Sequence, residues 1–83
     1  MQEKQEIFTR IRATLVELFE LDPARITADA RLYEDLEIDS IDAIDLLDRL
    51  RRLTGRKFDP ESFRSVRTVA DLVDSIHRLV NEA

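Results

Sequence analysis

The chain is organised around residues 34–48, which read EDLEIDSIDAIDLLD. This stretch holds seven acidic residues and no basic one, whereas the next nine positions, 49–57, hold five basic residues and no acidic one. A boundary this sharp between acidic and basic residues indicates a surface that meets partner proteins. Ser40 stands inside the acidic part, where a helix is expected to begin.

Size and composition favour a small helical domain. We expect residues 1–83 to form a single domain, because a chain of this length is near the size at which one hydrophobic core suffices. Aromatic residues make up 6% of the chain, and Leu, Ala, Glu, Arg and Asp predominate, which disfavours a sheet. The sequence therefore predicts an all-α fold.

Composition also disfavours several classes of function. The chain has no cysteine, which excludes a thiol nucleophile, a disulfide framework and a zinc–thiolate site. Its net charge of −5 disfavours nucleic-acid binding, because phosphate neutralisation supplies most of that affinity. No apolar run approaches the roughly 18–20 residues of a membrane span. We expect a cytoplasmic protein, monomeric when free, whose partners carry positive surfaces.

Hydrophobic periodicity predicts a small bundle of three long helices and one short helix. The long helices are expected over Glu3–Leu21, from Ser40 to about Leu53, and from Thr68 to about Asn81. The short helix is expected over Pro60–Arg64, and a single turn over residues 22–26. Gly55 stands where a left-handed residue would end the second long helix, and Thr68 and Asp71 form a variant of the capping box.

A long loop is expected between the first two long helices. No period holds over residues 27–39, and a loop of this length in a compact domain usually has a purpose. Irregularly spaced apolar residues should pin the loop to the core. They are Ile26, Leu32, Tyr33, Leu36 and Ile38.

Ser40 has two interpretations, a helix N-cap or a hydroxyl that another enzyme modifies. Serine is a common N-cap residue, and a helix N-terminus also stabilises a phosphate group. A catalytic role is disfavoured, because no His or Lys lies nearby in the sequence to activate the hydroxyl. The only histidine, His77, is expected at a surface or boundary position of the last helix.

Aspartate recurs every three residues at Asp39, Asp42, Asp45 and Asp48, which gives a slanting stripe on a helix. The stripe is either a solvated face or a docking surface. Docking is favoured because Asp is a poor helix former and because carboxylates near a helix C-terminus oppose the dipole. An EF-hand calcium site needs ligands at alternate positions and a glycine at the bend, so we expect no metal.

The second long helix has more apolar positions than one core face needs. Leu46, Leu50 and Leu53 are expected to face the core. Ile41 and Ile44 are expected to lie half exposed beside Ser40, as contacts for a partner or for a tethered chain.

The motif Asp39-Ser40-Ile41, preceded by Leu32-Tyr33-Glu34-Asp35-Leu36 and followed by an acidic helix, resembles the phosphopantetheine attachment motif of acyl carrier proteins. The resemblance covers almost the whole chain. It implies that a phosphopantetheinyl transferase moves 4′-phosphopantetheine from coenzyme A onto Ser40, with Asp39 as its motif partner. Acyl groups would then be carried as thioesters on the terminal thiol of the arm, by a protein that is not itself an enzyme.

The same resemblance implies docking residues and partners. A ketosynthase, ketoreductase, dehydratase and acyl-loading enzymes of a fatty-acid or polyketide type would dock on the second long helix. The docking residues would be Ile41, Asp42, Ile44, Asp45, Asp48, Arg51 and Arg52.

The sequence departs from the commonest family pattern in two places. Glu37 stands where many members have glycine, so the loop before the site should be less free to adopt positive φ. Arg51 and Arg52 stand where fatty-acid carriers tend to have acidic residues, and Asp48 stands where they tend to have an apolar one. These differences suggest that this end of the helix docks on other enzymes than those of housekeeping fatty-acid synthesis. The chain also resembles the carrier proteins of bacterial aryl polyene gene clusters. This resemblance is carried by residues 32–36 (LYEDL), 52–57 (RLTGRK) and 63–69 (FRSVRTV).

Two alternatives stay open at this point. A peptidyl or aminoacyl carrier would use the same arm, although the acidic second long helix slightly disfavours it. A helical adaptor would bind a partner through Ile41 and Ile44, with Ser40 as an unmodified cap.

Overall fold

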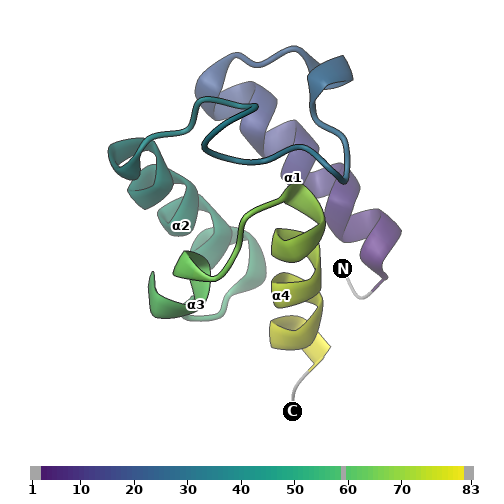
Figure 1. Ribbon diagram of the computed structural model, residues 1–83. Coiled ribbons are helices and arrows are strands. Elements are labelled where there is room, and N and C mark those ends of the chain that lie inside the picture. The colour runs from purple at the N-terminus through teal and green to yellow at the C-terminus, as the bar shows by residue number, and fades with distance from the viewer. Residues whose placement is uncertain (1–2, 59, 82–83) are drawn as a thin grey trace.

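The computed structural model describes residues 3–58 and 60–81. Its elements, in chain order, are α1 (Lys4–Phe19), the 3-10 helix η1 (Pro23–Arg25), α2 (Ser40–Thr54), α3 (Pro60–Arg64) and α4 (Val69–Asn81) (Figure 1). The all-α class is confirmed. The expected three long helices and one short helix are present, and the turn expected over residues 22–26 adds a 3-10 helix to this count. Within the described ranges, no helix is long and apolar enough to cross a membrane.

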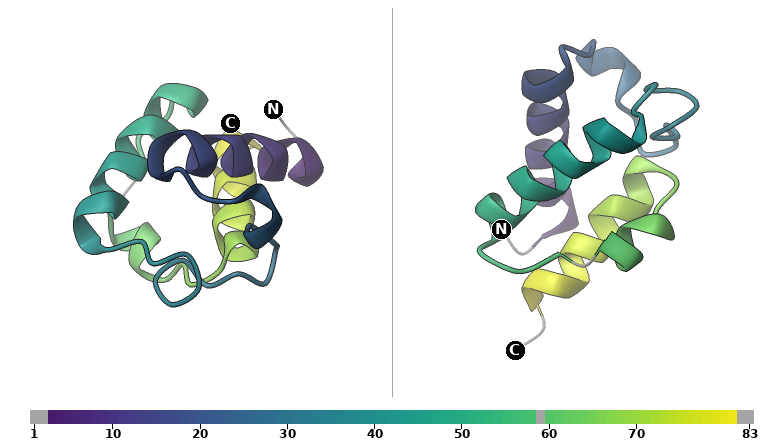
Figure 2. Two further views of the ribbon diagram at one scale, coloured as in Figure 1. Left: turned by 90° about the horizontal axis from the view of Figure 1, so that it is seen from above. Right: turned by 90° about the vertical axis from the view of Figure 1, so that its left-hand side faces the viewer.

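Helix α1 forms the base against which the other two long helices pack. It contacts both α2 and α4, which slant across it in the same sense (Figure 2). The core is made of side chains that are almost fully buried. The largest of them are Ile7, Ile11, Leu15, Ile26, Leu32, Leu46, Leu50, Leu72, Ile76, Val66 and Val69.

Two residues expected in the core lie at the surface instead. Leu53 is 37% exposed, because it belongs to the last turn of α2, where the core no longer covers the helix. Tyr33 is 46% exposed, because its neighbour Leu32 is fully buried and successive side chains in this turn cannot both face inward. The other four expected loop anchors, Ile26, Leu32, Leu36 and Ile38, are buried as predicted.

The connection between α1 and α2 is fastened to the start of α4 by backbone hydrogen bonds. The Leu32 N–H donates to the Arg67 carbonyl at 2.9 Å, and the Val69 N–H donates to the Ala30 carbonyl at 3.0 Å. The Ala70 N–H adds a third bond, to the carbonyl of Ala28, at 2.9 Å. Apolar anchors and backbone bonds therefore hold the long connection in one place, which fixes the point at which α2 begins.

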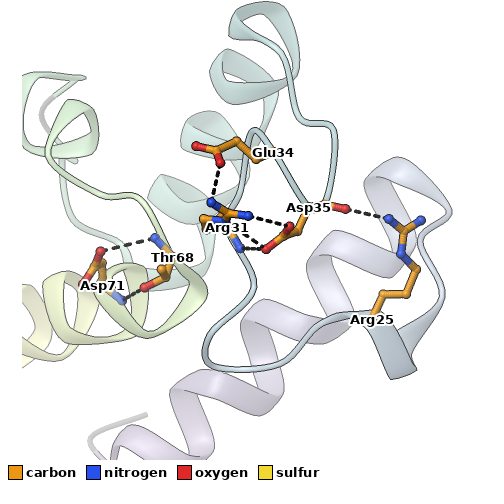
Figure 3. Close-up of polar contacts among 6 residues, drawn as sticks. All are labelled: Arg25, Arg31, Glu34, Asp35, Thr68 and Asp71. Carbon is orange, nitrogen blue, oxygen red and sulfur yellow. Dashed lines mark hydrogen bonds and ion pairs between the residues drawn. The ribbon is translucent and has the colours of Figure 1, made fainter.

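Helix α4 begins with the capping box that the sequence predicts (Figure 3). The Asp71 N–H donates to Thr68 Oγ1 at 3.1 Å, and the Thr68 N–H donates to Asp71 Oδ2 at 3.2 Å. The Arg67 N–H donates to the same carboxylate oxygen at 3.2 Å. These backbone bonds, from Arg67 first and then from Thr68, lower the pKa of Asp71.

Candidate functional site

Helix α2 is capped by Asp39, so of the two interpretations of Ser40 the N-cap is wrong. Asp39 Oδ1 accepts hydrogen bonds from the N–H groups of Ile41 at 3.0 Å and Asp42 at 2.8 Å. The Asp42 side chain in turn accepts from the Asp39 N–H at 3.4 Å, which completes a capping box. Asp39 rather than Ser40 caps the helix because a capping box needs a polar side chain three residues after the cap. Asp42 supplies a carboxylate for Asp39, whereas Ala43 follows Ser40 at the same spacing.

The consequence for Ser40 is a free hydroxyl. Ser40 is the first residue of α2 and is exposed to solvent. In the part of the chain that the structure describes, no side chain or backbone group is hydrogen-bonded to its hydroxyl. The side chain therefore has no capping role, and no general base within the described residues activates it. The arrangement suits a group that an outside enzyme modifies.

The backbone just before Ser40 is held in an unusual conformation. Glu37 has φ 56°, in the left-handed region that favours glycine, although we expected a non-glycine residue to restrict this conformation. The conformation is imposed by the next residue, because Ile38 is buried and its N–H donates to the Leu32 carbonyl at 3.0 Å. Two residues further on, the chain emerges at Ser40 in the solvent.

Two acidic residues of the stretch 34–48 are bound to Arg31 within the turn at residues 31–35 (Figure 3). The Arg31 guanidinium pairs with Glu34 at 2.6 Å and with Asp35 Oδ2 at 3.4 Å. The Arg31 N–H also donates to Asp35 Oδ2 at 2.8 Å, and Arg25 donates to the Asp35 carbonyl oxygen at 2.6 Å. The backbone bond from Arg31 and then its guanidinium lower the pKa of Asp35. Glu34 and Asp35 therefore stabilise the loop.

The solvent-facing side of α2 carries most of the residues expected to dock a partner. Ile41 is 72% exposed and Ile44 is 66% exposed, which is more than the half exposure expected for them. The remaining positions follow at helical spacing on the same side and are also exposed. They are Asp45, Asp48, Arg51 and Arg52. We call Ile41, Ile44, Asp45 and Asp48 the exposed face of α2.

Asp42 and Arg49 of α2 are half-buried, and each has a partner within the fold. Asp42 is half-buried and belongs to the capping box, so its carboxylate is partly occupied. Arg49 Nη1 pairs with Glu17 Oε1 of α1 at 3.0 Å, which ties the two helices together.

His77 is half-buried on α4, the boundary position that the sequence predicts.

Comparison with known proteins gives consistent matches over most of the chain. The family model described as "Phosphopantetheine attachment site" matches residues 9–76. "Acyl carrier protein 2" of Ralstonia nicotianae is 49% identical over 75 residues, which cover 90% of this chain and 93% of the relative. "Acyl carrier protein" of Thermotoga maritima is 31% identical over 78 residues, which cover 94% of this chain and 96% of the relative.

A more distant match has a specialised name. "Meromycolate extension acyl carrier protein" of Mycobacterium tuberculosis is 29% identical over 79 residues, which cover 95% of this chain and 69% of the relative. The three relatives come from different bacteria and all carry the description acyl carrier protein, and one of them is named for meromycolate extension.

Proposed function

Because the chain belongs to the acyl carrier protein family, we propose that Ser40 is the residue that receives its 4′-phosphopantetheine arm. The protein is a non-catalytic carrier, and its arm is attached covalently by a transferase. The observation that carries the assignment of Ser40 is its free, exposed hydroxyl. Asp39 supports the site by capping α2, which leaves the serine available for modification.

The residues at the start of α2 fit a phosphodiester. Ser40 lies at the positive end of the helix dipole, where a phosphate is stabilised. Exposure of Ser40 allows the arm to point away from the protein and into the site of another enzyme. The arm, once attached, supplies the thiol that the chain itself lacks, and acyl groups are carried on it as thioesters.

The exposed face of α2 is the surface we assign to partner enzymes. Ile41 and Ile44 would fill an apolar depression on the partner, while Asp45 and Asp48 would face its basic residues. The partners would be a phosphopantetheinyl transferase, a ketosynthase, a ketoreductase, a dehydratase and acyl-loading enzymes. Asp42 would contribute less than its neighbours, because its side chain also holds the capping box.

For the pathway, we propose assembly of a polyketide-type chain, as in aryl polyene biosynthesis. This proposal is supported by the motif over residues 32–36 and by the basic residues Arg51 and Arg52, which replace an acidic continuation of α2.

Transfer of the arm in vitro tests the assignment of Ser40. The apo-protein is incubated with coenzyme A, magnesium and a broad-specificity phosphopantetheinyl transferase, and its intact mass is measured. We expect the wild type to gain one phosphopantetheinyl group and Ser40→Ala to gain none. Ser65→Ala, a change at another exposed serine, is the matched control and should be modified like the wild type.

The other outcomes are equally informative. A mass gain that persists in Ser40→Ala would contradict the assignment. If the wild type gains no mass and binds a partner equally well with Ser40→Ala, the protein is an unmodified helical adaptor. A modified arm that is loaded by an amino-acid-adenylating enzyme would make the protein an aminoacyl carrier.

A further inference from the structure

A hollow of about 450 Å³ lies between the end of α1 and the segment that leads into α2. We call it the α1 hollow. Its floor is apolar and is formed by side chains from both segments. They are Leu18, Phe19, Leu21, Leu36 and Ile38. The three floor residues at the end of α1 are only half-buried, so part of this apolar surface faces solvent.

The rim of the α1 hollow is acidic. Of the described residues that line it, four are acidic and none is basic. Glu17 is paired with Arg49 at 3.0 Å, and Asp42 belongs to the capping box of α2. Glu20 and Glu37 are exposed, and within residues 3–58 and 60–81 neither is paired with a basic side chain. The fold therefore leaves two negative charges beside an apolar floor.

Both unpaired glutamates hold the left-handed backbone conformation, with φ 54° at Glu20 and φ 56° at Glu37. Glycine adopts this conformation without steric cost, whereas a residue with a Cβ does not. The backbone at these two positions therefore gives no reason for a glutamate side chain. Since neither carboxylate bonds to the described part of the fold, the two side chains contribute charge to the surface rather than stability to the domain.

A long cationic side chain fits this arrangement. The apolar stem of Arg or Lys lies well on a hydrophobic floor while the charged head stays at the rim. Arg also stacks on aromatic rings, and Phe19 belongs to the floor. A purely apolar group would leave both glutamates without a partner, and an anionic group would be repelled by them.

The α1 hollow lies close to Ser40. Ile38 and Asp42, which line the hollow, are each two residues from Ser40, so their Cα atoms lie within about 8 Å of the Ser40 Cα. A standard interface covers about 800 Å² on each partner, which is a patch about 16 Å in radius. A protein that acts on the Ser40 hydroxyl itself therefore covers the near edge of the hollow. A protein that acts at the far end of the arm is not held to this distance.

We propose that the α1 hollow receives an Arg or Lys side chain of the phosphopantetheinyl transferase while the arm is being attached to Ser40. Membership of the family requires this encounter, and it is the one in which the serine hydroxyl itself must enter the site of the other enzyme. The contact extends the acidic docking surface from α2 to the end of α1. The inference rests on the proposed assignment of Ser40.

Charge reversal with a matched control tests the proposal. Glu20→Lys/Glu37→Lys is compared with Glu3→Lys/Asp29→Lys, which changes two exposed carboxylates outside the hollow by the same charge. Glu3 and Glu20 lie at opposite ends of α1, about 25 Å apart along its axis. Thermal unfolding of each apo-carrier is recorded first. Initial rates of arm transfer are then measured against carrier concentration, with coenzyme A and the phosphopantetheinyl transferase of the same source organism.

At low ionic strength we expect the hollow variant to raise the KM for the carrier about tenfold with little change in kcat, and the control variant to raise it less than about twofold. The difference should shrink at high salt, because these charges are exposed. Glu20→Lys alone should raise KM about threefold. Because Glu20 lies on α1, that effect does not come from an altered backbone next to Ser40.

A binding measurement without turnover locates the contact. The Ser40→Ala carrier, labelled with ¹⁵N, accepts no arm and is titrated with unlabelled transferase. We expect the amide signals of residues 17–21 and 37–38 to shift together with those at the start of α2, while the signals of residues 3–6 stay unchanged. The same spectra are compared for the wild-type carrier with and without its arm, in the absence of the transferase.

Three results would overturn the proposal. Equal KM values for the two double variants would show that only net charge matters, and a wild-type KM for the hollow variant would show that the hollow is simply solvated. Signals of the hollow that change on attachment of the arm, but not on addition of transferase, would assign the hollow to the arm instead. If the wild type gains no mass, the proposed function itself fails, and this is seen before any variant is compared.

Discussion

Helices α2 and α4 begin with the same device but use it differently. Each has a capping box built from residues three positions apart, Asp39 with Asp42 and Thr68 with Asp71. In α4 the cap is the hydroxyl of Thr68, which accepts a hydrogen bond from the Asp71 N–H. In α2 the cap is a carboxylate, and the hydroxyl of Ser40 next to it is left free. A serine at a helix start is therefore available for chemistry when its neighbour caps the helix.

The start of α4 is also the better fastened of the two. Backbone bonds join residues 67–70 to the connection between α1 and α2, and Val69 is fully buried. The start of α2, by contrast, is exposed at residues 39–41. One helix start stabilises the fold, whereas the other presents a reactive group.

The largest expected effect comes from removing each hydroxyl in turn. Thr68→Ala should lower the free energy of unfolding by about 1 kcal/mol, since a cap is lost, and should leave uptake of the arm unchanged. Ser40→Ala should change stability by less than about 0.5 kcal/mol and abolish uptake of the arm. Urea denaturation and intact mass measure the two effects. A large stability loss in Ser40→Ala would mean that the serine does cap the helix.

The next effect is expected from acid, which should weaken the capping box of α4 and the turn at residues 31–35. Asp71 and Asp35 have pKa values below those of unfolded carboxylates, so their contribution to stability is present above about pH 4 and is lost as pH falls through the lowered values. We expect the free energy of unfolding to decrease as the pH is lowered under about 4. Asp71→Asn should flatten this fall. An unchanged pH profile in Asp71→Asn would show that Asp71 does not couple folding to protonation.

A smaller effect is expected on the exposed face of α2. Asp45→Lys should raise the KM of a partner enzyme about threefold at low ionic strength, and less at high ionic strength, because it removes an exposed charge pair. Asp29→Lys, an exposed aspartate in the connection, makes the same change in net charge and should have little effect. Equal KM values for Asp45→Lys and wild type would return the aspartate stripe to a solvated face.

The smallest effect is expected at Glu37, in the segment that leads into α2. Glu37→Gly relieves the cost of positive φ but increases the entropy of the unfolded chain, so stability should stay within about 0.5 kcal/mol of the wild type. Glu37→Val should cost about 1 kcal/mol or more, since a β-branched side chain tolerates this conformation poorly. If the valine variant were as stable as the glycine variant, the left-handed conformation would not be required before Ser40.

Much of the fold was accessible from sequence because the signals are local. The period of apolar residues predicted the three long helices, Gly55 predicted the end of α2, and the spacing of Thr68 and Asp71 predicted the box of α4. The same spacing in Asp39 and Asp42 could have identified the cap of α2. It was missed because Ser40, an equally good cap type, stands directly beside Asp39.

What sequence reasoning could not reach depends on contacts between distant segments. No local pattern reveals that Leu32 and Ala30 bond to residues 67 and 69, because these bonds involve backbone atoms alone. Tyr33 was expected in the core because it is apolar, but burial of Leu32 turned it outward. The candidate site was accessible from its motif, while the free state of the Ser40 hydroxyl required the structure.

The most direct test of the central claim is to locate the arm by peptide mapping of the modified protein. Trypsin is expected to release residues 32–49, a peptide that contains Ser40 as its only serine, no threonine, and one further hydroxyl, on Tyr33. We predict that the phosphopantetheinyl group is found on this peptide and that fragmentation places it on Ser40. A group found on any other residue, or on a peptide from the α4 region that holds Thr68, would contradict the account.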